Sequence, residues 1–110
     1  MKETDTNTDT ATFENGTAPF GNVLLCAVIS KQEIPKIPAQ VRYRNFVYML
    51  THNEEIIYVG RSTNLRLRLS GWKNCRDFDK VYLCEYLTHT ENCQSERFYI
   101  NHFKPAYNRR

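Results

Sequence analysis

One acidic residue, Glu96, lies on a helix face where an apolar residue is expected. Tyr99, Ile100 and Phe103 form an apolar stripe at helical spacing, and Glu96 continues that stripe one turn towards the N-terminus. A carboxylate on such an inward face is rare unless it is paired, coordinates a metal ion or takes part in a reaction. Glu96 is therefore the first candidate functional residue.

One basic residue, Arg68, occupies a similar position. Leu65, Leu69 and Trp72 recur at helical spacing, and Arg68 shares their face. Arg68 and Glu96 could form a structural salt bridge with each other, or extend to water at the edge of the core. They could equally belong to a functional site, because both settings hold charges of this kind. The residues alone leave these interpretations open.

Arg68 follows a segment that has the pattern of a β-hairpin and then a helix. Residues 46–50 and 56–59 are β-branched and aromatic runs, and the polar residues 52–55 between them predict the loop of an antiparallel hairpin. Gly60 ends the second strand. The strict alternation of Leu and Arg over residues 65–69 is typical of a strand, but the helix-capping residues Ser62–Asn64 just before it favour a helix.

Glu96 follows a third strand, which the pattern predicts over residues 80–87. A second helix is predicted from about residue 91 to residue 103, with Thr90 as its cap and Pro105 as its end. The order of elements is therefore β-β-α-β-α. This order predicts an α+β fold in which a small three-stranded antiparallel sheet is flanked by helices.

The chain before the hairpin predicts three further features. Residues 1–18 are almost entirely polar and predict a flexible tail. Residues 22–29 are a continuous apolar run that fits either a buried strand or the inward side of a short helix. Residues 34–39 contain two prolines and predict an extended connector. We therefore divide the chain into a tail (1–18), an N-terminal extension and linker (19–43) and a compact domain (44–110).

The composition excludes several classes of protein. A chain of 110 residues is the size of one domain, and 41% hydrophobic residues suffice for a core. No apolar run is long enough to span a membrane, and the polar start does not resemble a secretory signal, so we expect an intracellular protein without a membrane partner. The four cysteines lack zinc-site spacing, which predicts free thiols.

Charge is distributed unevenly along the chain. Residues 1–40 hold three Lys against five Asp or Glu, a net charge of −2. Residues 41–110 hold twelve Lys or Arg against seven Asp or Glu, a net charge of +5, and most of the aromatic residues. Basic and aromatic residues together fit a nucleic-acid partner, although an ordinary basic surface fits the charge equally well.

Five elements in order resemble the GIY-YIG nuclease superfamily. The strand residues Phe46-Val-Tyr48 are followed by Tyr58-Val-Gly60, and Arg68 lies eight residues after that glycine. Further on, Glu96 on a helix and the closing Pro105-Ala-Tyr-Asn108 complete the pattern. The resemblance covers about residues 44–110 and includes both charged residues that the helix periodicity identified.

The resemblance implies a role for each of four residues in phosphodiester hydrolysis. Glu96 would hold one divalent ion, Mg²⁺ or Mn²⁺, whose other ligands would be waters. Arg68 would bind the scissile phosphate through its bidentate guanidinium. Tyr48 is similar to the tyrosine proposed as general base, and it would need the metal and Arg68 nearby to lower its pKa. Tyr58 would position or assist the nucleophile. The alternative for both tyrosines is a packing role in their strands.

The DNA phosphate backbone is the partner that the resemblance implies. Arg61, just after the glycine, would join the catalytic set and add a phosphate contact, or it could contribute only surface charge. The remaining predicted DNA-binding residues are Arg66, Lys73, Arg76 and Asn108.

Two positions depart from the family pattern. Phe46 replaces the glycine of the first motif. Trp72 stands four residues after Arg68, where many members have Tyr or His, and an indole can donate a hydrogen bond but cannot act as an acid or base. We therefore interpret Trp72 as a packing residue. The histidines His52, His89 and His102 match no family role and are interpreted as surface or helix-end residues.

The function that the resemblance implies is a small stand-alone, metal-dependent DNA endonuclease of viral, plasmid or bacterial type. The chain lacks the added recognition segments of restriction and homing members, so we expect low sequence specificity, unless a partner or oligomerisation supplies it. A nucleic-acid-binding module that has lost cleavage is the alternative. A purely protein-binding domain fits the basic charge less well.

Overall fold

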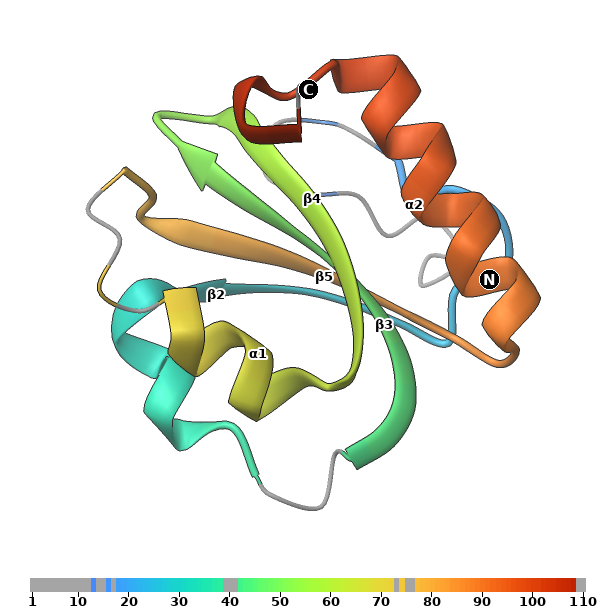
Figure 1. Ribbon diagram of the computed structural model, residues 1–110, viewed down its shortest axis with the longest axis horizontal. Helices are drawn as coiled ribbons and strands as arrows, with labels where there is room; N and C mark the ends of the chain where they lie inside the picture. The colour runs from blue at the N-terminus through green and yellow to red at the C-terminus, as the bar shows by residue number, and fades with distance from the viewer. Residues whose placement is uncertain are drawn as a thin grey trace, which may run out of the picture.

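The computed structural model describes residues 13, 16, 18–38, 42–72, 74 and 77–108. Its central feature is a four-stranded antiparallel sheet in the order β2-β5-β3-β4, formed by β2 (Leu25–Ser30), β5 (Lys80–Tyr86), β3 (Arg42–His52) and β4 (Glu55–Asn64). The helices are α1 (Leu65–Trp72) and α2 (His89–Phe103), with short 3₁₀ helices η2 (Lys31–Lys36) and η4 (Ala106–Asn108) (Figure 1). None of the described helices has the length and apolar character needed to cross a membrane.

The α+β class and the sequence of strands and helices are confirmed, but the sheet has four strands rather than three. The extra strand is β2, within the apolar run for which the sequence left two interpretations open. It pairs with β5 over its whole length, from Leu25 opposite Glu85 to Ser30 opposite Lys80. Hydrogen bonding to a strand 55 residues later in the sequence decides the conformation, which local periodicity could not reveal.

The β3–β4 hairpin is longer and tighter than predicted. Its turn is only two residues, Asn53 and Glu54, and both have positive φ angles of 51° and 72°. This is the geometry of a type I′ turn, whose twist matches that of the flanking strands. The strands therefore extend through His52 and from Glu55.

Helix α2 begins two residues before the prediction. Thr88, not Thr90, is its N-cap: the Thr88 hydroxyl accepts from the backbone N–H of Glu91, and the Glu91 carboxylate accepts from that of Thr88. This reciprocal capping box fixes the start of the helix. Lys104, in the left-handed conformation (φ 48°), and then Pro105 end it.

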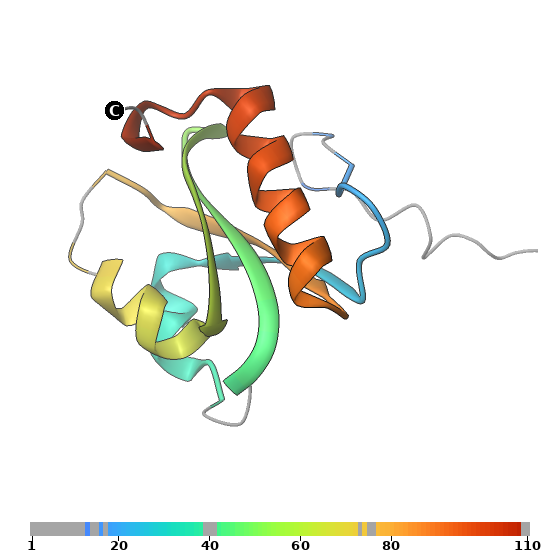
Figure 2. The same ribbon diagram turned by 45° about the vertical axis from the view of Figure 1, so that its right-hand side comes forward.

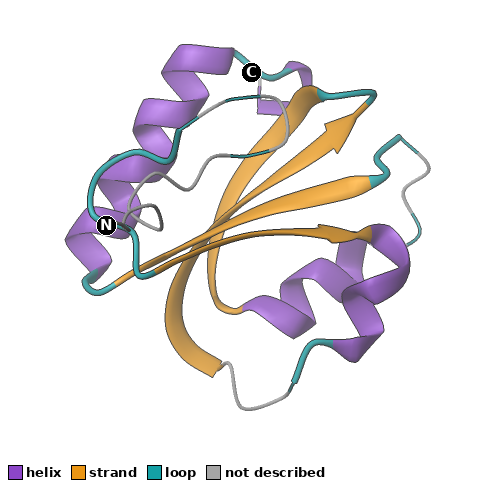
Figure 3. Ribbon diagram, turned by 180° about the vertical axis from the view of Figure 1, so that it is seen from behind, coloured by secondary structure: helices purple, strands orange, loops and turns teal. Residues whose placement is uncertain are grey.

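Both faces of the sheet are covered (Figures 2 and 3). On one face α2 and the N-terminal segment pack on Val47, Met49 and Tyr82. On the other face α1 and η2 pack on Phe46, Tyr48 and Leu50. The alternation along β3 follows from the two-residue period of a strand, and every one of these side chains is buried.

Described residues from the N-terminal part of the chain contribute to this core. Phe13 lies within the predicted tail, yet it is 2% exposed and stacks on Tyr82 with ring centroids 4.5 Å apart. Phe20 donates its backbone N–H to the Tyr99 hydroxyl and accepts from the Tyr86 hydroxyl through its carbonyl, each at 2.5 Å. The side chain of Phe13 and the backbone of Phe20 therefore both contact the core. The rest of residues 1–17, apart from Gly16, lies outside the described residues.

Candidate active site

Tyr48 is the buried centre of the candidate site. It lies on β3 opposite Gly60 of β4, and its side chain is completely buried. A Cβ added to Gly60 would lie 2.6 Å from both Cζ and Oη of Tyr48 and 2.9 Å from a ring carbon of Tyr58. Contacts this short do not occur at real Cβ atoms, so only glycine allows the two phenol rings to approach the strand here. The close packing of these two rings therefore explains why glycine occupies this position of the sequence motif.

Trp72 joins this aromatic cluster. Its indole Nε1 donates to Tyr48 Oη at 3.3 Å, and its ring packs on Tyr58 at a centroid separation of 4.8 Å. The packing interpretation of Trp72 is confirmed, and the hydrogen bond adds a positioning contact. Because the indole N–H occupies one acceptor site of Tyr48 Oη, it restricts how that hydroxyl is oriented.

Burial controls the ionisation of Tyr48. Desolvation is the largest effect and raises the pKa of Tyr48 to about 12, while the Trp72 hydrogen bond and the positive charge of Arg68 act in the opposite direction. The phenol is therefore neutral at neutral pH in the protein alone. The sequence interpretation required a lowered pKa of Tyr48 for its role as general base, but in the protein alone this pKa is raised.

Arg68 projects from α1 differently from the prediction. Leu65 and Leu69 are buried, as expected for the inward face, but the Arg68 side chain is exposed. Arg68 lines a cavity of about 400 Å³ between β4, α1 and α2 instead of entering the core. Its charge lies close enough to Tyr48 to act on the pKa of that phenol.

Glu96 pairs with Arg61 and not with Arg68. Arg61 Nε lies 2.8 Å from Glu96 Oε1, and the two side chains are 40% and 25% exposed. Arg61 comes from β4 and lies opposite Val47, on the face of the sheet that α2 covers. Among the described residues no ion pair joins Glu96 to Arg68, so the salt-bridge interpretation that the sequence left open does not apply to that pair.

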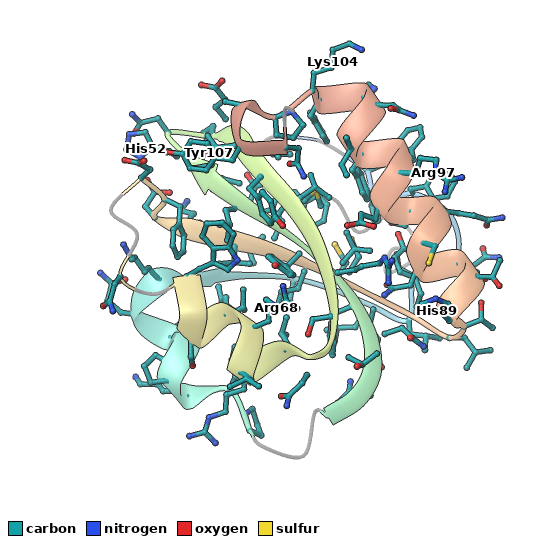
Figure 4. The ribbon with its side chains drawn as sticks, in the orientation of Figure 1. His52, Arg68, His89, Arg97, Lys104 and Tyr107 are labelled. Atoms are coloured by element: carbon teal, nitrogen blue, oxygen red, sulfur yellow. The ribbon has the colours of Figure 1, made fainter. Side chains whose placement is uncertain are left out.

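The cavity connects the two parts of the site. Arg61, which holds Glu96, and Arg68, which acts on Tyr48, both line it, together with His89 and Asn92 from α2. Figure 4 shows Arg68 on α1 and His89 at the beginning of α2, on either side of β4 in that view. The sequence did not identify His89 or Asn92, because only the approach of α2 to the end of β4 brings them to this cavity.

The remaining predicted residues have different surroundings. Asn108 accepts from the backbone N–H of Val59 at 2.8 Å and donates to the Val59 carbonyl at 2.9 Å, which attaches η4 to β4 beside Gly60. Arg66 is exposed on α1. Lys73 and Arg76 lie outside the described residues.

The side chains present fit a hydrated divalent cation. No group of three or more His, Cys, Asp or Glu residues is placed to hold a metal among the described residues, so a site with several protein ligands is not formed there. Glu96 offers one half-buried carboxylate that already holds the guanidinium of Arg61. A single carboxylate with waters is the coordination that Mg²⁺ accepts readily, and the cation would compete with Arg61 for Glu96.

The sequence matches no protein-family model and no curated protein, but the fold matches solved structures. The GIY-YIG N-terminal endonuclease domain of UvrC from Thermotoga maritima, as a point mutant bound to the catalytic divalent cation, superposes with a TM-score of 0.60 at 20% identity, covering 72% of this chain and 98% of that domain. The same domain bound to magnesium gives a TM-score of 0.58 at 19% identity, covering 72% and 94%. At this identity the match establishes a shared fold.

Proposed function

We propose that this protein is a metal-dependent endonuclease that hydrolyses phosphodiester bonds in DNA. The observation that supports this proposal most is the arrangement around β4. Four elements, β3, β4, α1 and α2, contribute the proposed site residues Tyr48, Tyr58, Arg61, Arg68 and Glu96, on a fold shared with a known endonuclease domain. The likeness supports the fold, and the side chains support the chemistry.

Arg61 and Arg68 are the proposed phosphate-binding residues. Both residues line one cavity, and a guanidinium can bind two phosphate oxygens at once. Such contacts carry no base information, which supports the proposal of low sequence specificity. Arg66, Lys73 and Arg76 would extend the contact along the DNA backbone, with an affinity that falls as salt rises.

Glu96 is the proposed ligand for Mg²⁺ or Mn²⁺, as one ion. When bound, the ion would supply positive charge that stabilises the anionic transition state and favours deprotonation of the nucleophile. Arg61, displaced from Glu96, would be free to bind phosphate, so the same residue holds the carboxylate before binding and the substrate afterwards.

Tyr48 would first release its phenolic proton to solvent, and the resulting phenolate is the proposed acceptor of the proton from the attacking water. The water oxygen attacks phosphorus, the bond from phosphorus to the leaving oxygen breaks, and solvent returns a proton to that oxygen. Trp72 orients Tyr48 Oη, and Arg68 lowers the cost of forming the phenolate. Tyr58 packs against both rings and is proposed to position them. The side-chain amide of Asn108 both accepts from and donates to the backbone of Val59. We therefore propose a positioning role for Asn108 rather than a DNA contact.

A plasmid assay distinguishes this proposal from a module that binds nucleic acid without cleaving it. Purified protein is incubated with supercoiled plasmid in Mg²⁺, Mn²⁺ or EDTA. The proposal predicts conversion to nicked or linear plasmid with either metal and none in EDTA. A protein that retards the plasmid on a gel but leaves it supercoiled in both metals would support the binding module.

A further inference from the structure

The cavity beside Arg68 contains groups that phosphate binding does not require. Leu67 of α1 is 70% exposed and lines it together with His89 of α2, which carries an imidazole ring. An exposed apolar side chain that lines a cavity can pack against a ligand there. Leu67 and His89 therefore offer an apolar surface and a flat ring next to the two guanidinium groups.

Asn92 provides an unsatisfied acceptor in the same cavity. Its side chain is 1% exposed, and its amide nitrogen donates to the Phe46 carbonyl at 3.3 Å, which fixes the orientation of the amide. The other end, Oδ1, is buried and accepts no hydrogen bond from any described residue. A buried acceptor without a partner is uncommon and favours a ligand that brings a donor. His89 and Arg61 beside it are exposed side chains that can move to admit one.

We propose that this cavity is a subsite for one unpaired nucleotide next to the scissile phosphate. Arg61 and Arg68 hold the phosphate, Leu67 and His89 pack on the faces of the base, and the base presents an N–H donor towards Asn92. The volume of about 400 Å³ is within the range of small-molecule sites. A base inside a duplex cannot enter such a cavity unless it leaves the stack. The substrate class is therefore DNA with an unpaired nucleotide at the cut, such as a flap, a gap or a single strand.

The inference rests on the proposed function, because it takes Arg61 and Arg68 as phosphate ligands. Its test uses 2′-deoxyadenosine 5′-monophosphate and inorganic phosphate as probes, with dissociation constants from NMR titration of the ¹⁵N-labelled full chain. The wild type should bind the nucleotide at least about fivefold more tightly than phosphate, which is a modest gain for one stacked base.

Matched variants test which side chains provide this gain in affinity for the nucleotide. Leu67→Ala and His89→Ala should each reduce the advantage of the nucleotide over phosphate to less than about twofold, with phosphate binding unchanged for Leu67→Ala. Leu87→Ala is the control, since Leu87 is 71% exposed but lies outside the cavity, and it should retain the wild-type ratio. All three positions are exposed, so the variants should fold, and their NMR spectra report whether they do.

The outcomes separate the subsite from the nuclease. Equal affinity for nucleotide and phosphate, or an unchanged ratio in Leu67→Ala, overturns the subsite and leaves the nuclease proposal intact. Absence of phosphate binding by the wild type overturns the phosphate contact and the subsite together. A preference for the nucleotide that Leu67→Ala abolishes supports the subsite, even if the plasmid assay finds no cleavage and the nuclease proposal fails.

Discussion

Glu96→Gln should abolish cleavage at little cost in stability. The substitution removes the negative charge from a single ion pair, Arg61 Nε to Glu96 Oε1 at 2.8 Å, between side chains that are 40% and 25% exposed. A pair this accessible to water contributes about 0.2–1 kcal/mol. For a domain of this size, that lowers the melting temperature by less than about 8 °C. Arg61 can turn towards solvent, so its charge is not left buried.

Glu85→Gln is the contrasting control. The Glu85 carboxylate accepts two hydrogen bonds from Arg44, each at 2.7 Å, and the residue is 7% exposed on β5. Hydrogen bonds to charged groups contribute about 1.5–3 kcal/mol, so this variant should melt at a distinctly lower temperature than Glu96→Gln. It should still nick plasmid below its melting temperature, because Glu85 pairs with Arg44 and does not line the cavity beside Arg68.

The assay combines thermal melts by circular dichroism with plasmid nicking in Mg²⁺. We expect Glu96→Gln to be inactive and nearly as stable as the wild type, and Glu85→Gln to be active and less stable. If Glu96→Gln nicked at the wild-type rate, Glu96 would not be the metal ligand. If it melted at or below the temperature of Glu85→Gln, Glu96 would be a structural residue.

Three further predictions concern packing and ionisation. Gly60→Ala places a Cβ 2.6 Å from Tyr48 Oη, so we expect it to destabilise the fold by about 1–3 kcal/mol in urea titration and to slow nicking. A variant as stable as the wild type would show that the close approach of the tyrosine rings does not require glycine here. Tyr48→Phe should slow nicking by about 10²–10⁴-fold, as for loss of a general base. The pKa of Tyr48 is raised from 10 to about 12, so its protonated phenol stabilises the fold fully below pH 10 and this contribution is lost towards pH 12. The free energy of unfolding should therefore fall less between pH 10 and pH 12 in Tyr48→Phe than in the wild type. An equal fall in both proteins would argue against a raised pKa. Phe13→Ala removes a buried ring that stacks on Tyr82 and should cost about 3–5 kcal/mol in urea titration, and a cost near zero would show that the segment does not dock.

Local sequence patterns predicted the elements well where one signal was sufficient. The hairpin and the third strand follow from β-branched and aromatic runs, and α1 follows from its capping residues. The patterns failed where a distant partner decides the conformation. β2 becomes a strand because β5 pairs with it, and Phe13 is buried because Tyr82 offers a ring to stack on.

The candidate site was predictable for residue types and less so for their contacts. Helix periodicity identified Arg68 and Glu96 as unusual, but it placed both on inward faces and suggested that they could pair. In the structure Glu96 forms an ion pair with Arg61, and the Arg68 side chain is exposed. Arg61 can reach Glu96 because it lies on the face of the sheet that α2 covers. His89 and Asn92 gave no signal in the sequence, since their importance comes only from the cavity that they line.

The most direct test of the central claim is single-turnover nicking of plasmid by the wild type and by Arg68→Lys, with protein in excess over DNA, in Mg²⁺ and in EDTA. Arg68 is exposed, so the lysine variant should fold normally, and lysine keeps the charge but loses the bidentate contact. We predict that the wild type nicks only in Mg²⁺ and that Arg68→Lys is slower by about 10²–10³-fold, as for loss of a transition-state contact. A wild type that does not nick in Mg²⁺, or a lysine variant that nicks at the same rate, would contradict the account.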